Sequence, residues 1–126
     1  MKHTDLKKIV LPEGDDERII EAAKQLVYEG VCHPVLIGDP EVISLQMGYS
    51  DKFTVLPVDR QPLAAIKADA VRAGKQFPVE DAALVQGAAL VRDGVADGIV
   101  AGAVNATTDV YRTYFKTIGV KEGVSR

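Results

Sequence analysis

Short β-rich runs alternate with longer helical runs along most of the chain, and this alternation constrains the fold more than any other feature. The runs typical of strands are residues 7–12 (KKIVLP), 33–40 (HPVLIGDP), 53–58 (FTVLPV) and 96–103 (ADGIVAGA). The runs with helical spacing are residues 15–30, 41–48, 62–75, 78–94 and 107–119. Strands that alternate with helices form βαβ units. The pattern therefore predicts an α/β fold of three layers, α/β/α, with a mainly parallel sheet.

Several boundaries of these elements carry local signals. Acidic residues open the first helical run, and Gly30 is well placed to end it. Asp39 and Pro40 are typical of an N-cap and a first helical turn, and Gly119 is expected to stop the last helix. The tail after Gly119 (VKEGVSR) resembles a loop, where a compact α/β layer would continue with another strand. We therefore expect the chain to be unfinished.

Length and composition narrow the class of protein. The 126 residues suit one domain, and 47% hydrophobic with 26% charged residues is typical of a soluble globular protein. A net charge of −3 argues against a nucleic-acid partner, although a local basic pocket for small anions stays possible. The sequence contains no membrane-length apolar run and only one cysteine, Cys32. We expect a cytoplasmic protein that does not enter a membrane.

The sequence offers little for metal or covalent chemistry. His3 and His33 are the only histidines, and neither lies in a ligand-spaced cluster. Cys32 and His33 are adjacent, so on a strand they would point to opposite faces and make a poor nucleophile–base pair. A buried structural thiol is the favoured interpretation of Cys32. Nucleotide-binding and hydrolase motifs of the G-x-S-x-G, Walker A and G-x-G-x-x-G types are absent from the sequence.

The run VAGAVNATTDVYR, residues 100–112, has the order of a strand end, a small-residue turn and a helix N-terminus. Such a junction presents free backbone N–H groups and the positive end of a helix dipole, which together favour an anion. Arg112 would lie about one turn inside the helix and could reach back with a two-pronged donor. The candidate binding residues of this anion corner are Gly102, Ala103, Asn105, Thr107, Thr108 and Arg112.

Plain helix capping explains the same residues, because Thr107, Thr108 and Asp109 are good cap and first-turn residues. Arg112 could equally pair with a surface carboxylate.

Two further polar clusters can also be explained either by ligand binding or by the stabilisation of a helix end. The acidic residues of LPEGDDER, residues 11–18, could contact substrate hydroxyls, but helix opening favours them more strongly. Arg72 and Lys75 meet at a helix end, where basic residues suit the dipole without any ligand.

Three segments taken together resemble the N-terminal part of the phosphate acetyltransferase (phosphate acetyl/butyryltransferase) family. They are IVLPEGDDERIIEAA, HPVLIGDP and ADGIVAGAVNATTDVYRTYFKTIG, and they occur in the family's order. The resemblance implies one lobe of a two-lobed fold like that of isocitrate and isopropylmalate dehydrogenases, with the active site between the lobes. It also implies the interconversion of acetyl-CoA plus phosphate with acetyl phosphate plus CoA. CoA would act as a substrate, and no cofactor would be tightly bound.

Carried over by position, Arg112 matches the family arginine of the Asp-x-x-Arg segment, a candidate for binding phosphate or CoA. Arg72, in VRAGK, is similar to a second family arginine linked to CoA or substrate, although the alignment is looser there. Gly102, Ala103, Thr107 and Thr108 would form the loop that faces the acyl phosphate. Asn105 departs from the histidine or serine of many members, and RTYF departs from the common Arg-Pro sequence.

Family members are more than twice as long as this chain, and their second half supplies much of the cleft. The resemblance therefore implies that residues 1–126 are the N-terminal lobe of a longer protein and are inactive alone, with no catalytic residue of their own. Met1 and the residues after it favour a genuine N-terminus. We expect CoA, acetyl phosphate and phosphate as partners, in a homo-oligomer. Two alternatives remain: a non-catalytic acyl-CoA sensor like the C-terminal domain of some malic enzymes, and a phosphate butyryltransferase.

Overall fold

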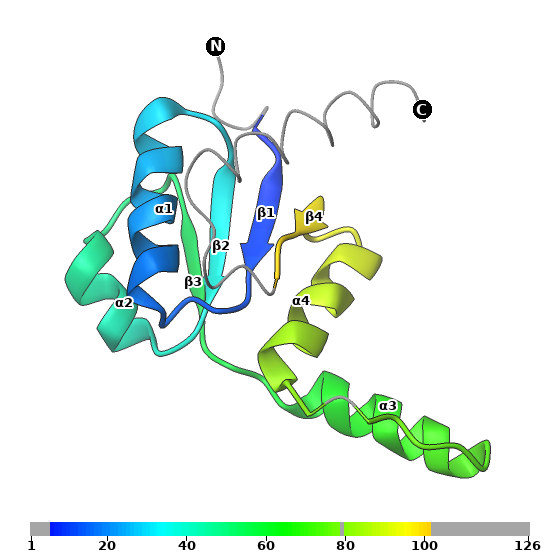
Figure 1. Cartoon of the computed structure of the whole chain (residues 1–126). Coiled ribbons are helices and arrows are strands. Elements are labelled where there is room, and N and C mark those ends of the chain that lie inside the picture. Colours follow the sequence, from blue (N-terminus) through cyan, green and yellow to red (C-terminus); the bar gives the residue numbers. More distant parts are fainter. Residues whose placement is uncertain (1–5, 79, 102–126) are drawn as a thin grey trace.

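The computed structural model describes residues 6–78 and 80–101, which form four strands and four helices (Figure 1). In chain order they are β1 (Lys8–Leu11), α1 (Glu17–Glu29), β2 (His33–Ile37), α2 (Pro40–Met47), β3 (Thr54–Leu56), α3 (Gln61–Arg72), α4 (Ala82–Arg92) and β4 (Gly98–Ile99). Every strand and helix predicted within these residues is confirmed. The helix predicted over residues 107–119 lies outside the described residues.

The described strands form one parallel sheet in the order β3-β2-β1-β4. The central strand β1 pairs with β2 on one side, where Val10 lies opposite Val35, and with β4 on the other, where Val10 lies opposite Ile99. A parallel sheet needs cover on both faces, because its strands are apolar on both sides. The predicted mainly parallel α/β fold is therefore confirmed.

The two faces of the sheet bury different sets of side chains. Ile9, Leu11 and Leu36 pack in one apolar cluster with the buried residues of α1 and with Ile43 of α2. Val10 points to the other face, since successive side chains of a strand alternate. Its cluster contains Val35, Ile37 and Ala96, with Ala83, Leu90 and Val91 of α4 packed against it. The sheet thus lies between α1 and α2 on one face and α4 on the other.

The helix caps show why the chain turns where it does. The Asp16 side chain accepts a hydrogen bond from Arg18 N at 2.8 Å and begins α1, and Gly30, with φ of 69°, ends it. Asp39 and Pro40 begin α2 as predicted. The helix predicted from residue 78 starts later, at Ala82, because the Asp81 side chain accepts from Leu84 N and acts as the N-cap.

Helix α4 approaches the sheet most closely at Gly87. A Cβ atom added there would lie 2.7 Å from Ile99 Cδ1 and 2.8 Å from Val10 Cγ1, so the glycine allows the contact with both β1 and β4. Helix α3 packs on α4 rather than on the sheet, through Leu63, Ile66 and Val85, and Figure 1 shows it extending away from the sheet. Among the described residues, none of the helices is long and apolar enough to cross a membrane.

Candidate functional site

The sheet order reverses between β1 and β4. The chain first adds β2 and β3 on one side of β1, and then returns through α3 and α4 to place β4 on the other side. In open α/β sheets, ligands bind outside the carboxyl ends of the strands at such a reversal. The candidate site therefore lies at the carboxyl ends of β1 and β4, which we call the switch point.

The switch point joins the two sequence motifs that were singled out as candidates. Strand β1 ends at Leu11 and leads into PEGDDER, and β4 ends at Ile99 and leads into the anion corner. Val100 N donates to Val10 O at 3.0 Å, so the chain still follows β1 where it leaves β4. The two motifs thus begin on adjacent strands. They are distant in the sequence, because Pro12, where the first motif begins, and Ile99, after which the second begins, are 87 residues apart.

The residues predicted to form the anion corner, Gly102, Ala103, Asn105, Thr107, Thr108 and Arg112, lie outside the described residues. The described chain reaches Ala101, directly after the end of β4. The anion corner therefore follows immediately from the switch point, and the roles of its six residues stay predictions.

Asp97 fixes the start of β4 against β1. Its carboxylate oxygen Oδ2 accepts from Lys8 N at 2.8 Å, and its own N–H donates to Lys8 O at 2.7 Å. Gly98 follows, is buried, and lies opposite Ile9 of β1. The Asp-Gly pair of ADGIV thus sets the register of β4 and, with it, the position at which the chain enters the anion corner.

The loop after β1 is locked onto the loop after β2. Gly14 N donates to Ile37 O at 3.0 Å, and a Cβ on Gly14 would approach that oxygen to 2.8 Å. The Asp15 side chain accepts from Asp39 N at 2.6 Å, and Asp39 in turn caps α2 by accepting from Glu41 N at 3.0 Å. Two loops of the carboxyl edge are therefore held together by a backbone hydrogen bond and by the Asp15 side chain.

These contacts explain two of the acidic residues of LPEGDDER, Asp15 and Asp16, without a ligand. Asp16 opens α1, as the helix-opening interpretation predicts, and Asp15 holds the start of α2. The side-chain hydrogen bond from Arg18, with the backbone N–H of the same residue, lowers the pKa of Asp16. Both carboxylates therefore have structural partners within the described chain.

A buried glutamine that sequence reasoning missed holds the third loop of this edge. Gln86, only 7% exposed, lies on α4; its Nε2 donates to Pro57 O at 3.0 Å, and its Oε1 accepts from Asp59 N at 2.8 Å. One side chain thus pairs two backbone groups of the loop after β3. The available signal was a single amide in an otherwise apolar helical run, AALVQGAALV. A buried amide needs partners of this kind.

Arg72 is the one predicted site residue that lies within the described chain. It is the last residue of α3, its side chain is 73% exposed, and it forms an ion pair with Asp69 one turn earlier. Figure 1 shows this end of α3 pointing away from the sheet, so the described structure does not bring Arg72 to the switch point. Lys75 lies just beyond it and is exposed. A role in binding CoA stays a prediction for Arg72.

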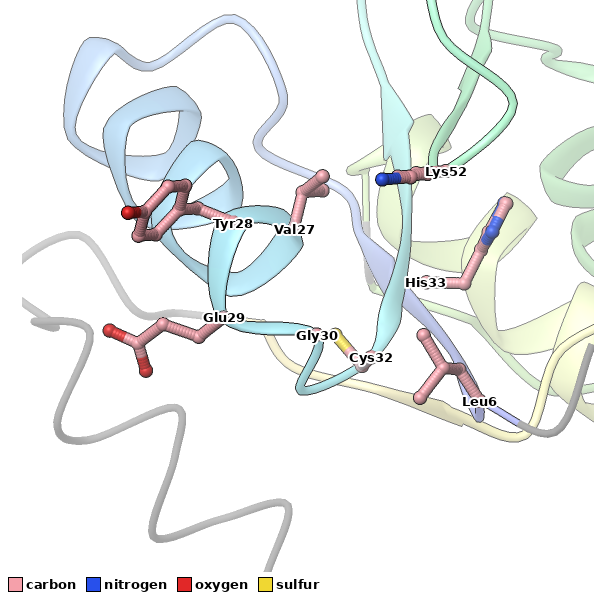
Figure 2. A pocket seen from close by; sticks show the side chains of 8 residues that line it. All are labelled: Leu6, Val27, Tyr28, Glu29, Gly30, Cys32, His33 and Lys52. Carbon is pink, nitrogen blue, oxygen red and sulfur yellow. The ribbon is translucent and has the colours of Figure 1, made fainter. Parts of the chain in front are cut away.

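A hollow at the opposite, amino edge of the sheet gathers several polar side chains (Figure 2). It has a volume of about 200 Å³ and lies between the end of α1 and the start of β2. Its lining residues are Leu6, Val27, Tyr28, Glu29, Gly30, Cys32, His33 and Lys52. Ligands of open α/β sheets bind at the carboxyl edge, so this position does not favour a substrate site. In the part of the chain that the structure covers, the metal-ligating side chains form no group of three or more.

Cys32 behaves as a structural thiol. It is 2% exposed in the cluster that joins α1 to the sheet, and burial raises its pKa to about 12. Because the thiolate is the reactive form, we expect iodoacetamide at pH 8 to leave Cys32 unmodified in the folded chain and to label it in 6 M urea. Mass spectrometry of the two samples tests this. Equal labelling in both would contradict the burial of this thiol.

His33 makes the stability of the chain depend on pH. Its Nε2 lies 2.8 Å from Thr54 Oγ1, and burial, together with the charge of Lys8, lowers its pKa below the ordinary value of 6.5, while Asp51 raises it. A histidine whose folded pKa is lowered contributes stability above pH 6.5 that is lost as pH falls through the folded pKa. We therefore expect the urea midpoint to fall between pH 7 and pH 5.

The matched variant is His33→Gln, which keeps a partner for Thr54 and cannot titrate in this range. Its urea midpoint should fall less over the same pH interval. A pH dependence identical to that of the unsubstituted chain would show that His33 does not carry the effect.

Comparisons with known proteins agree with the resemblance. The sequence matches the family described as "Phosphate acetyl/butaryl transferase" over residues 1–126. It is 35% identical to a phosphate acetyltransferase of Staphylococcus aureus (strain MRSA252), over 94% of this chain and 40% of that protein. A phosphate acetyltransferase of Staphylococcus epidermidis is 34% identical over the same shares. The chain therefore spans about two fifths of the length of these curated relatives.

Comparison with solved structures agrees with the family match. The fold is similar to that of a phosphotransacetylase from Streptococcus pyogenes, with a TM-score of 0.56 and 31% identity over 85% of this chain and 36% of that one. It is also similar to the EutD phosphotransacetylase from Staphylococcus aureus, with a TM-score of 0.50 and 30% identity over 80% and 34%. The expected likeness to a dehydrogenase lobe stays a prediction, because both of these structures are phosphotransacetylases.

Proposed function

The chain belongs to the phosphate acetyl/butaryl transferase family, and on that premise we propose that it is the N-terminal lobe of a phosphate acetyltransferase. The longer protein would interconvert acetyl-CoA plus phosphate with acetyl phosphate plus CoA. The observation that carries the proposal is the family match along the whole chain, together with the curated relatives from Staphylococcus aureus and Staphylococcus epidermidis, which are named phosphate acetyltransferases. The acyl-CoA sensor alternative has no comparable support among them.

The proposed reaction is a direct transfer. The CoA thiolate attacks the carbonyl carbon of acetyl phosphate, a C–S bond forms, and the C–O bond to the phosphoryl group breaks. Phosphate leaves with the electron pair. This route needs no nucleophile from the lobe, which agrees with a structural Cys32. The catalytic base for the CoA thiol would come from the rest of the protein.

The lobe would contribute binding and orientation. The anion corner leaves β4 at the switch point, where helix N-terminal N–H groups and Arg112 would hold the phosphoryl oxygens. The contacts of Asp97 with Lys8 would fix the start of β4, and the hydrogen bond from Val100 N to Val10 O would hold the end of β4, which carries this corner, beside β1. Hydrogen-bond donors that are in place before the reaction stabilise the negative charge that develops in the transition state of acyl transfer.

Small anions are the proposed partners: CoA, acetyl phosphate and phosphate. We further propose a cytoplasmic location, supported by the presence of one buried cysteine and by the absence of a membrane-length apolar run in the sequence. The homo-oligomer stays a prediction. The family description names acetyl and butyryl transfer together, so the length of the acyl chain that the protein prefers also has to be tested.

A coupled assay on the full-length protein tests the function. Purified protein with CoA and acetyl phosphate should consume acetyl phosphate only when CoA is present, and acetyl-CoA should accumulate at the same rate. Butyryl phosphate under the same conditions measures the chain-length preference. An absence of turnover with both acyl phosphates would refute the assignment.

A further inference from the structure

The sequence of β4 specifies the register of this strand only weakly. The strand comprises Gly98 and Ile99, and in the part of the chain that the structure describes it pairs with β1 alone, at an edge of the sheet (Figure 1). The run that contains it, ADGIVAGAV (residues 96–104), consists of glycine, alanine, valine and isoleucine apart from Asp97. Register is weakly specified in glycine-rich strands. The position of β4 along β1 therefore depends on a further contact.

The two largest side chains at the end of β4 penalise a slip only modestly. Ile99 packs in the apolar cluster on the α4 face of the sheet, and Val100 packs against the cluster on the face covered by α1 and α2. A slip by one residue would move each of them to the opposite face. Val100 would then take the place of Ile99, at the loss of one methylene group, and both side chains are only half-buried.

Asp97 makes a contact that exists in one register only. Its N–H donates to Lys8 O at 2.7 Å, and its Oδ2 accepts from Lys8 N at 2.8 Å, so both backbone groups of one β1 residue are paired with it. A hydrogen bond to a carboxylate is stronger than one between neutral groups. After a slip, Ala96 or Gly98 would lie opposite Lys8, and neither has a side chain that can accept the Lys8 N–H.

The register of β4 decides where the chain leaves the sheet. Val100 N donates to Val10 O at 3.0 Å, and the described chain reaches Ala101 directly afterwards. A slip by one residue moves this exit by about 3.3 Å along β1. The groups of a substrate site have to be held within about 0.5 Å of their working positions. A contact at the amino end of β4 thus matters to a site that begins at its carboxyl end.

We propose that Asp97 is a positioning residue for the binding of acetyl phosphate. It fixes the register of β4 against β1, and through β4 it fixes the point at which the chain enters the anion corner. Asp97 itself does not contact the substrate in this account. The inference rests on the proposed function, which supplies the acyl phosphate and assigns it to the anion corner.

Steady-state kinetics of the full-length protein test the positioning role. Asp97→Ala should raise the KM for acetyl phosphate about tenfold, less than the ~10²-fold cost of a misplacement of about 1 Å in a substrate site. Asp97→Asn keeps a carbonyl oxygen where Oδ2 accepts from Lys8 N, and it should recover most of the loss. If Asp97→Ala does not fold, Asp97→Glu, with its carboxylate one methylene further from the backbone, replaces it with the same expected direction.

The matched control is Asp81→Ala. The Asp81 carboxylate also accepts one backbone N–H, from Leu84 at 3.1 Å, but it caps the start of α4 and does not contact β4 through this bond. Its loss should lower the melting temperature and leave the KM for acetyl phosphate unchanged. A purely structural role of Asp97 would give the same result, since a smaller folded fraction lowers the maximal rate and not the KM.

Amide hydrogen exchange in the full-length protein tests whether the effect passes along β4. In Asp97→Ala, the Lys8 N–H loses its acceptor and should exchange faster. The Val100 N–H, which keeps its own acceptor at Val10 O, should also lose protection, because the register of β4 is no longer fixed. In Asp81→Ala both amides should keep the protection that they have in the unsubstituted protein.

The outcomes separate this inference from the proposed function. An unchanged KM for acetyl phosphate in Asp97→Ala, or a Val100 N–H that stays protected in this variant, overturns the inference and leaves the acetyltransferase assignment intact. A full-length protein without turnover in its unsubstituted form refutes the proposed function. The exchange of the Val100 N–H then decides by itself whether Asp97 fixes the register of β4.

Discussion

Replacing Gly87 by valine should destabilise the chain by about 3 kcal/mol, at the upper end of the cost of overpacking a core. A Cβ at this position already meets Ile99 and Val10, and the larger valine side chain cannot be accommodated unless α4 moves off the sheet. Val10 is fully buried and β-branched, so it has little freedom to yield. The expected loss is a large part of the ~5–15 kcal/mol that stabilises a typical domain. Urea unfolding of the 126-residue chain measures it.

Ala88→Val is the matched control for this substitution. It introduces the same side chain one position further along α4, at an exposed site, so the clash is absent. Helix propensity falls from alanine to valine but rises from glycine to valine, so propensity cannot explain a larger loss at Gly87. We expect a loss of about 0.5 kcal/mol for Ala88→Val. Similar losses in the two variants would show that Gly87 does not mark a close contact between α4 and the sheet.

Arg112→Ala in the full-length protein should lower kcat/KM by a factor on the order of 10² while the melting temperature stays nearly unchanged. The family resemblance places Arg112 in the anion corner, where its guanidinium would offset the charge that develops on the phosphoryl oxygens. Loss of such a donor removes transition-state stabilisation and leaves the fold intact. Steady-state rates at varied CoA and acetyl phosphate, with a thermal melt of each variant, measure both effects.

Arg92→Ala is the control for Arg112. Arg92 is the last residue of α4; it is exposed and pairs with the adjacent Asp93, which makes it a surface arginine with a local partner. Its removal should leave kcat/KM within a factor of two of the unsubstituted value, because surface pairs of this kind contribute little. An Arg112→Ala enzyme with unchanged rate constants would remove Arg112 from the site.

The alternation of strands and helices was sufficient to predict the fold, because a parallel sheet requires helices of this length between its strands. Asp39 with Pro40, and Gly30, set the predicted ends of their helices for local reasons that are visible in sequence. The start of α4 was predicted too early, because apolar spacing does not reveal which of several polar residues acts as the cap. In the structure this residue is Asp81.

The candidate site was only partly predictable from the sequence. The two motifs of the switch point could each be found as a polar run after a strand, but their adjacency depends on β1 pairing with β4, a long-range contact. The roles of Asp15 and Gln86 depend on loops that are distant in sequence, Asp39 in one case and Pro57 in the other. Local patterns carry no information about such partners. The order of residues suggested an anion at this corner but left plain helix capping as an alternative, and the family resemblance assigned the acyl phosphate to it.

A structure of the full-length protein with CoA bound tests the central claim most directly. The account predicts that the CoA thiol lies at the carboxyl ends of β1 and β4, beside the chain that leaves Ala101. Density for CoA in the hollow at the amino edge, between Tyr28 and Lys52, would contradict it.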